Sequence, residues 1–154
     1  ELGLVGSEMC IRDRNYTEED SVNPINKYAI SKLGGECAVK MYDNSLILRI
    51  MMCEKPFIHK SAFYDVKTNF IFQEDVAMMI PKLLNEKGII NIGGKTQSVY
   101  NFAKKYNNKI KKISGKKIFP PNPSLNLTKL KKILNWEYQN VKMRDQTIKF
   151  EKLI

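Results

Sequence analysis

The stretch NPINKYAISKLGGE, residues 23–36, and the apolar run SLILRIMM, residues 45–52, decide how this sequence is interpreted. The first belongs to a segment with helical apolar spacing from Ile25 to Tyr42, and Pro24 suits a helix entrance. The second is a continuous apolar run, typical of a strand that is buried on both faces of a parallel sheet. A helix followed directly by such a strand predicts an α/β fold.

The downstream sequence continues this alternation of helices and strands. The expected strands are residues 68–72, 88–94 and 116–119, and the expected helices are residues 74–85, 98–106 and 128–134. Ser98 is the expected cap of the second of these helices. Residues 53–67 are expected to form a loop over a site, and residues 141–153 are weakly amphipathic. This order predicts an α/β sheet.

Composition restricts the class of protein. The 154 residues are 43% hydrophobic and 27% charged, which excludes a collagen-like polymer and wholesale disorder. No apolar run reaches the length of a membrane span and no secretory signal is recognisable, so we expect a cytoplasmic protein. Cys10, Cys37 and Cys53 contain no C-x-x-C, so we expect neither disulfides nor a metal site, with Cys37 buried in a helix.

Positive charge is concentrated in the second half of the chain. The formal net charge is +10, and no acidic residue occurs between Glu86 and Glu137, where twelve lysines lie between Lys87 and Lys132. Such a block is typical of proteins with an anionic partner, but an AT-rich coding sequence produces the same bias. No recognition helix or aromatic stacking motif accompanies it, so a nucleic-acid partner is not expected.

Three pairs in the sequence have a tyrosine four residues before a lysine, a spacing that places both side chains on one helix face. About one such pair is expected by chance from 7 tyrosines and 22 lysines, and the three are Tyr28/Lys32, Tyr100/Lys104 and Tyr138/Lys142. An ammonium group favours the ionised phenol, which makes the tyrosine a usable proton donor and acceptor. Only Tyr28/Lys32 lies within a longer informative string.

That string resembles the extended short-chain dehydrogenase/reductases, and within them the sugar-nucleotide reductases of the dTDP-4-dehydrorhamnose reductase type, whose helix has the form NPxNxYxxSKLxGE. Further matches follow in the family's order: LILRI (46–50), NFIFQEDVA (69–77), GIINIGG (88–94) with SVYNFA (98–103), and NPSLNLTKL (122–130). The resemblance covers residues 16–134. It implies the C-terminal part of a Rossmann-like parallel sheet with a small α/β substrate-binding portion.

The resemblance also implies roles for individual residues. Tyr28 would protonate the carbonyl oxygen of a nucleotide-linked keto sugar, while Lys32 would favour the phenolate and bind the nicotinamide ribose of NADP or NAD. Met51 and Met52 fall where the family's backbone approaches the nicotinamide and the substrate. The alternatives are a half-exposed helix face for the first pair and core packing for the two methionines.

Two parts of the family's pattern are missing from the sequence. These are the Gly-rich turn for the pyrophosphate and the catalytic Ser or Thr expected about two dozen residues before Tyr28. Residues 1–14 fit no structural period and are interpreted as a non-native tail. We therefore expect a C-terminal fragment, inactive alone, with the catalytic helix and strand in residues 15–52 and the remaining sheet and substrate-binding portion in residues 53–154.

Oligomeric state and reaction type complete the expectations. Gly34 and Gly35 interrupt the helix that makes the usual dimer contact of the resembled family, so a homodimer is expected for the intact protein, with close helix packing at these glycines. A sugar-nucleotide epimerase or dehydratase of the same superfamily stays open as an alternative. So does a non-catalytic binding protein on the same scaffold.

Overall fold

In the computed structural model, residues 15–22, 24, 26–116 and 118–134 are described. The helices are α1 (Lys27–Val39), α2 (Gln73–Leu83), α3 (Val99–Lys104) and α4 (Thr128–Leu134). The strands are β1 (Leu46–Ile50), β2 (Met52–Cys53), β3 (Ser61–Phe63), β4 (Lys67–Thr68), β5 (Ile71–Phe72), β6 (Gly88–Ile92), β7 (Gln97–Ser98) and β8 (Lys111–Ile113). Helices are interspersed with strands that pair mostly in parallel, which confirms the predicted α/β class.

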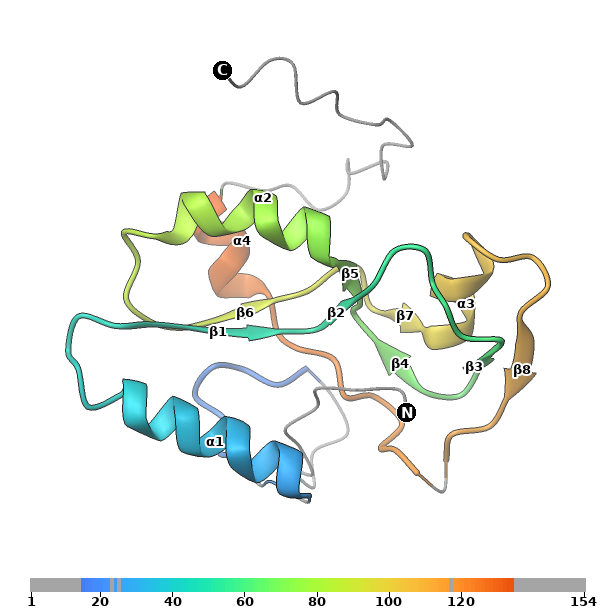
Figure 1. Cartoon of the computed structure of the whole chain (residues 1–154), viewed down its shortest axis with the longest axis horizontal. Coiled ribbons are helices and arrows are strands. Elements are labelled where there is room, and N and C mark those ends of the chain that lie inside the picture. Colours follow the sequence, from blue (N-terminus) through green and yellow to red (C-terminus); the bar gives the residue numbers. More distant parts are fainter. Residues whose placement is uncertain (1–14, 23, 25, 117, 135–154) are drawn as a thin grey trace, which may run out of the picture.

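The longest strands, β1 and β6, pair in parallel, with Leu46 opposite Gly88 and Ile50 opposite Ile92. Helix α1 covers one face of this pair, and α2 and α4 cover the other (Figure 1). The second face forms an apolar core of Ile71, Val76, Met79, Leu83, Ile90, Ile92 and Leu130, against which Leu46, Leu48 and Ile50 pack. Alternate side chains of β1 therefore point to opposite helix layers, as a strand requires.

A second core lies beside the first and is built around aromatic rings. Here β2–β5 and β3–β8 pair in parallel and β4–β7 pairs antiparallel. Phe102 of α3 is 2% exposed, and its ring centroid is 5.8 Å from that of Phe70 and 5.3 Å from that of Phe72. These separations are within the range of favourable aromatic pairs. The ring cluster thus fixes α3 against the short strands.

Local signals in the sequence account for the helix starts. Ser98 caps α3, because its Oγ accepts a hydrogen bond of 3.1 Å from the Asn101 N–H. Helix α2 begins with Glu74 and Asp75 in its first turn, where negative charge offsets the helix dipole. Both features agree with the predicted helices. Helix α4 has the predicted bounds, with Leu130 buried against the sheet.

Two local predictions are wrong. The strand predicted at residues 116–119 is absent from the described residues of that range, since the N–H groups of Ile118 and Phe119 both donate to the Gly115 carbonyl, at 2.8 and 2.9 Å, and turn the chain. Residues 53–67 are not one loop, because they contain β3, which pairs with β8 fifty residues away in the register Ser61–Lys111. Each of these strands has only three residues, too few to show a recognisable alternation in the sequence.

The prediction that Cys37 is buried is also wrong, because it lies on an exposed face of α1. Within α1 only Ala29 is fully buried. A Cβ added at Gly34 or Gly35 would have no described atom within 4 Å, so no other described segment approaches these glycines closely. The predicted homodimer contact there stays a prediction. Cys10, Tyr138 and residues 141–153, which include Lys142, lie outside the described residues.

No helix in the described ranges is both long and apolar enough to cross a membrane.

Close backbone contact at Gly94 yields a stability prediction. The Gly94 N–H donates to the Asn69 carbonyl at 2.6 Å, and a Cβ at Gly94 would collide with the Phe70 carbonyl oxygen. We expect Gly94→Ala to lower the free energy of unfolding by about 2–3 kcal/mol, measured by urea denaturation. Gly34→Ala is the matched control and should raise it by about 1 kcal/mol, since alanine is the better helix former. Equal effects of the two substitutions would contradict this packing.

Candidate functional site

The first turn of α1 presents Tyr28. The Asn26 side chain caps the helix by accepting a hydrogen bond of 2.8 Å from the Ala29 N–H. Ala29, at 1% exposure, anchors this turn, whereas the neighbouring Tyr28 is 45% exposed. The tyrosine side chain is therefore accessible to a ligand while its backbone is fixed by the cap.

Tyr28 and Lys32 lie together, as their spacing predicts. The Lys32 ammonium nitrogen is 5.2 Å from the centroid of the Tyr28 ring, within the range of a cation–π contact. Helix α1 begins near the carboxyl end of β1 (Figure 1). The pair thus occupies the end of the parallel strands at which α/β sheets bind their ligands.

A groove of about 250 Å³ runs between α1 and β1. Lys32, Leu33, Gly35, Glu36 and Val39 line it from α1, and Leu46, Ile47, Leu48, Arg49, Ile50 and Met51 line it from the strand, with Val22 and Leu125. Its surface is apolar apart from the charged groups of Lys32, Glu36 and Arg49. Lys32 therefore faces an open groove that a second molecule or segment could enter.

The two candidate methionines have different surroundings. Met51 is 3% exposed and belongs to the aromatic core. Its N–H donates to the Ile92 carbonyl, and its carbonyl accepts a hydrogen bond from the Ile71 N–H. Met52 is 46% exposed and does not line the groove. Met51 is thus a packed residue at one end of the groove lining, whereas the side chain of Met52 is accessible to solvent. Their contact with a cofactor stays a prediction.

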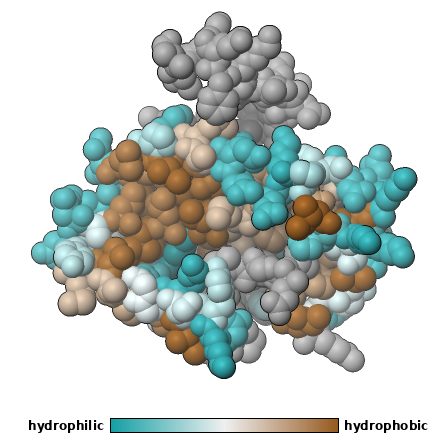
Figure 2. Space-filling view, in the orientation of Figure 1, coloured by the Kyte–Doolittle hydropathy of each residue, from teal (hydrophilic) through white to brown (hydrophobic). Residues whose placement is uncertain are grey.

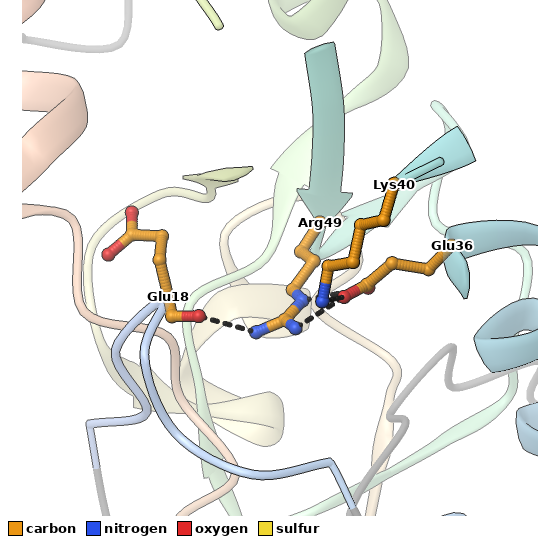
Figure 3. Close-up of polar contacts among 4 residues, drawn as sticks. All are labelled: Glu18, Glu36, Lys40 and Arg49. Atoms are coloured by element: carbon orange, nitrogen blue, oxygen red, sulfur yellow. Dashed lines mark hydrogen bonds and ion pairs between the residues drawn. The ribbon is translucent and has the colours of Figure 1, made fainter. Parts of the chain in front are cut away.

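An ion pair that the sequence analysis did not anticipate fastens α1 to β1. Arg49 donates from Nε to Glu36 Oε2 at 3.0 Å and from Nη2 to Glu36 Oε1 at 2.7 Å, a bidentate arrangement. The two side chains are 13% and 10% exposed. Figure 3 shows the guanidinium between this carboxylate and the backbone carbonyl of Glu18, with the Lys40 ammonium on the same carboxylate.

The same network reaches the second strand of the sheet. Arg49 Nη1 donates to the Glu18 carbonyl oxygen at 3.3 Å, and the Asn91 N–H of β6 donates to Glu18 Oε1 at 3.0 Å. The hydrogen bonds from Arg49, supported by Lys40, hold the pKa of Glu36 below its usual value, although burial acts in the opposite direction. Glu36 is thus a permanently charged anchor at neutral pH.

A signal for this pair is present in the sequence. Arg49 is the only charged residue in an eight-residue apolar run, and a charge in such a strand needs a partner. Glu36 lies four residues after Lys32 and therefore on the same face of the helix. The first observation calls for an acidic partner of Arg49, and the second makes Glu36 one candidate for it.

Two buried asparagines hold the segment before α4 across the ends of the strands. Asn69 donates to the Leu125 carbonyl at 3.0 Å and accepts from the Leu125 N–H at 3.1 Å. Asn91 donates from Nδ2 to the carbonyls of Tyr16, at 2.9 Å, and Asn126, at 3.2 Å. Both amides are fully buried. The bonds satisfy both amide atoms of Asn69 and the amide nitrogen of Asn91, which offsets the cost of removing these atoms from water, whereas Asn91 Oδ1 has no hydrogen-bond partner among the described residues.

Other reactive groups in the described part do not form a second site. Burial, with the nearby Glu74 and Glu54, raises the pKa of Cys53 to about 12, so its thiol is uncharged at neutral pH. No three His, Cys, Asp or Glu side chains of the described residues meet in a way that could hold a metal ion. His59 is half-buried, edge-on to Phe57 at 5.2 Å.

One member of the basic block has a structural contact in place of an anionic partner. The Lys129 ammonium donates to the Ile89 carbonyl at 2.6 Å and so ties α4 to β6. The ammonium nitrogens of Lys104 and Lys112 lie 5.8 and 4.9 Å from the centroid of the Tyr100 ring. Tyr100/Lys104 therefore repeats the local geometry of Tyr28/Lys32 at a distant place.

Comparison with solved structures gives the fold. A hypothetical dTDP-4-dehydrorhamnose reductase from Sulfolobus tokodaii matches 88% of this chain and 56% of its own, with a TM-score of 0.68 and 26% identity. The dTDP-4-dehydrorhamnose reductase of Bacillus anthracis in complex with NADP matches 84% of this chain and 54% of its own, with a TM-score of 0.66 and 23% identity. A UDP-glucuronic acid 4-epimerase from Bacillus cereus in complex with NAD matches 88% of this chain and 53% of its own, with a TM-score of 0.62 and 18% identity.

These similarities show that the chain shares the Rossmann-like α/β fold of part of each of these structures. The chain spans about half the length of each of these proteins. No protein-family model matches the sequence. No curated protein matches it either.

The ion pair generates a stability prediction. Arg49→Met leaves the Glu36 carboxylate half-buried without its bidentate partner, so we expect the free energy of unfolding to fall by about 2 kcal/mol. Lys40→Met is the matched control, because it removes an exposed partner of the same carboxylate and should cost at most about 0.5 kcal/mol. Denaturant titration of the two variants measures both values. Equal losses would contradict the anchoring role of Arg49.

The same pair predicts a pH dependence. Because the pKa of Glu36 is lowered by folding, its contribution to stability is present above the unfolded pKa and is lost as pH falls through the folded pKa. We expect the stability difference between the parent chain and Glu36→Gln to be largest above about pH 5 and to shrink on acidification. Denaturant midpoints measured from pH 7 to pH 3 test this. A difference that is constant with pH would be inconsistent with it.

Proposed function

We propose that this chain is the catalytic-helix and substrate-binding part of an NAD(P)-dependent sugar-nucleotide reductase. The observation that carries the proposal is the contact of Tyr28 with Lys32, at 5.2 Å, where Lys32 lines the groove that runs along β1. The similarity to solved reductases at TM-scores of 0.68 and 0.66 supports the same class of enzyme.

Location distinguishes Tyr28/Lys32 from the similar pair Tyr100/Lys104. Tyr100 packs against the aromatic core, and Lys104 lies on the α3 surface outside the groove. Tyr28 is 45% exposed, and Lys32 lines the groove. A proton donor must reach its substrate, so the pair on α1 is the one suited to chemistry.

The described residues fit one end of a dinucleotide cofactor. Lys32 offers an ammonium group that would bind the nicotinamide ribose. Met52 is exposed and follows Met51, which lines the groove. None of the described glycines opens a helix after a strand: Gly34 and Gly35 lie inside α1, and Gly93 and Gly94 pack against Asn69 and Phe70. The described residues therefore do not form a Gly-rich turn that could bind the pyrophosphate, and in the proposed enzyme a separate dinucleotide-binding part supplies that turn.

The proposed chemistry of the chain's own residues is a proton transfer. A nicotinamide cofactor, when bound, supplies hydride. The Tyr28 hydroxyl donates its proton to the carbonyl oxygen of the keto sugar, and the Lys32 ammonium stabilises the phenolate that remains. Asn26 and Ala29 hold the tyrosine in place during this step through the helix cap and the buried first turn.

A sugar-nucleotide epimerase or dehydratase is the second candidate. A dTDP-glucose 4,6-dehydratase from Bacillus anthracis and the Bacillus cereus epimerase both match with a TM-score of 0.62, over 86% and 88% of this chain. The same tyrosine and lysine would serve these reactions. Product analysis separates the classes, because only a reductase consumes one reduced cofactor for each sugar.

A chimaera tests the proposal. Residues 16–134 replace the matching part of the Bacillus anthracis reductase, which keeps its own dinucleotide-binding half, and NADPH oxidation is followed with a dTDP-4-keto sugar. We expect Tyr28→Phe to lower kcat at least about 100-fold, because it removes the general acid. Tyr100→Phe is the matched control, with an unchanged kcat.

The outcomes separate the candidate functions. A folded chimaera without activity, or one whose kcat is insensitive to Tyr28→Phe, would overturn the proposed catalytic role and favour a binding protein. The chain alone should oxidise no NADPH, and measurable oxidation by it would contradict the need for a second half.

A further inference from the structure

The strand β8 belongs to a strongly basic lobe on the side of the molecule away from α1. This β8 lobe, residues 57–68 and 97–119, has nine lysines and one acidic residue, Asp65. All eight of its described lysines are exposed, and none of them forms an ion pair with a described acidic side chain. Figure 2 shows mostly hydrophilic side chains, with isolated apolar ones among them, on the side where Figure 1 places α3 and β8.

Composition alone does not account for this distribution of charge. On α1, Lys40 pairs with Glu36 at 2.9 Å, and α2 contains Glu74 and Asp75 as well as Lys82. An AT-rich coding sequence raises the number of lysines along the whole chain, but the β8 lobe also lacks the acidic residues that would balance them. An unbalanced basic surface of this kind attracts an anionic partner.

The single acidic residue of the lobe holds the turn that follows β8. Asp65 Oδ1 accepts a hydrogen bond of 2.8 Å from the Gly115 N–H, and Asp65 Oδ2 accepts one from the Ser114 hydroxyl. Gly115 is buried, and a Cβ there would lie 2.6 Å from Val66 Cγ2 and 2.9 Å from Phe63 Cδ1. The turn therefore packs closely against β3 and presents its side chains from a fixed backbone.

Two isoleucines are exposed on this side of the lobe. The parallel register sets Ile113 opposite Phe63, so both side chains lie on one face of the β3–β8 pair. The turn borders the same face, because the ring centroids of Phe119 and Phe63 are 5.3 Å apart. Ile118 directly precedes Phe119 and is 64% exposed, while Ile113 is 37% exposed. The turn thus brings a second apolar side chain to the side that holds Ile113.

Two lysines accompany these isoleucines. Lys111 lies two residues before Ile113 and therefore on the same face of β8, and Lys116 belongs to the turn. Both lysines are exposed. We call Lys111, Ile113, Lys116 and Ile118 together the β8 surface. None of the four lines the groove that contains Lys32, so the β8 surface is separate from the proposed catalytic site.

We propose that the β8 surface docks this protein onto an anionic lipid bilayer. Its lysines meet the negatively charged headgroups, and Ile113 and Ile118 enter the boundary between headgroups and acyl chains. Nucleic acid fits the surface less well, because isoleucines do not stack on bases and the Tyr100 ring is already in contact with Lys104 and Lys112. The docking is independent of the proposed catalytic function.

Co-sedimentation of the 154-residue chain with lipid vesicles tests the docking. One set of vesicles contains phosphatidylcholine with about 30% phosphatidylglycerol, and the other contains phosphatidylcholine alone. We expect the chain to bind the anionic vesicles and to stay in solution with the neutral ones. The partition coefficient should fall when the salt concentration rises from about 0.1 M to about 0.5 M, because salt screens the attraction between lysines and headgroups.

Two double variants show whether the position of the charge matters. Lys111→Gln with Lys116→Gln should lower the partition coefficient at least about tenfold, since each basic residue close to an anionic surface strengthens binding about fivefold. Lys82→Gln with Lys87→Gln is the matched control, because it removes the same charge from exposed positions on and after α2. It should lower the coefficient less than about twofold, since its lysines stay outside the contact.

A further pair of variants tests the isoleucines. Ile118→Ser should lower the partition coefficient about fivefold, because its side chain no longer leaves water on docking. Ile30→Ser on α1, where the isoleucine is 57% exposed, is the matched control and should bind normally. The substituted side chains are exposed, and far-UV circular dichroism checks that each variant keeps the fold of the parent chain.

Four results would overturn the proposal. They are equal binding to the two kinds of vesicle, equal losses in the two lysine double variants, binding that Ile118→Ser leaves unchanged, and loss of vesicle binding when poly(dT) is added at the same phosphate concentration. The third would indicate attraction by net charge alone, and the fourth would identify nucleic acid as the partner. An inactive chimaera would count against the proposed function and leave the β8 surface unaffected.

Discussion

The ion pair between Glu36 and Arg49 sets the position of α1, and the candidate site depends on that position. Hydrophobic burial contributes little here, because Ala29 is the only fully buried residue of the helix. The bidentate contact, with nitrogen–oxygen distances of 3.0 and 2.7 Å, therefore fixes the rotation of α1 on β1. Lys32 precedes Glu36 by four residues and so faces the same groove. A turn of the helix by one residue would move Lys32 away from it.

The rest of the sheet region supports this arrangement through backbone and amide contacts. Glu18 accepts from both Arg49 and the Asn91 N–H, which joins the chain before α1 to both long strands. Asn69 and Asn91 hold Leu125 and Asn126 across the strand ends. On the opposite face, α2 and α4 bury the apolar side of β1 and β6. One face of the pair is thus a complete core, while the other remains half-covered.

Sequence reasoning predicted the elements whose determinants are local. The helix containing Tyr28 and Lys32, the strands at Leu46–Ile50 and Gly88–Ile92, and the Ser98 cap follow from spacing and capping chemistry. The strand β3 was missed because its partner β8 lies about fifty residues away and neither segment has a period of its own. Cys37 was placed in the right helix and on the wrong side, since apolar spacing cannot show that a helix face lacks a covering neighbour.

The sequence by itself determined the α/β class, the α1–β1 order and the adjacency of Tyr28 and Lys32, because helical periodicity places residues four apart on one face. Only the tertiary structure decided which tyrosine–lysine pair lies beside a groove. Tyr28/Lys32 and Tyr100/Lys104 have the same spacing and similar ring contacts, at 5.2 and 5.8 Å. They differ in what packs around them: an aromatic core holds Tyr100, whereas the Glu36–Arg49 pair holds α1 beside the groove along β1.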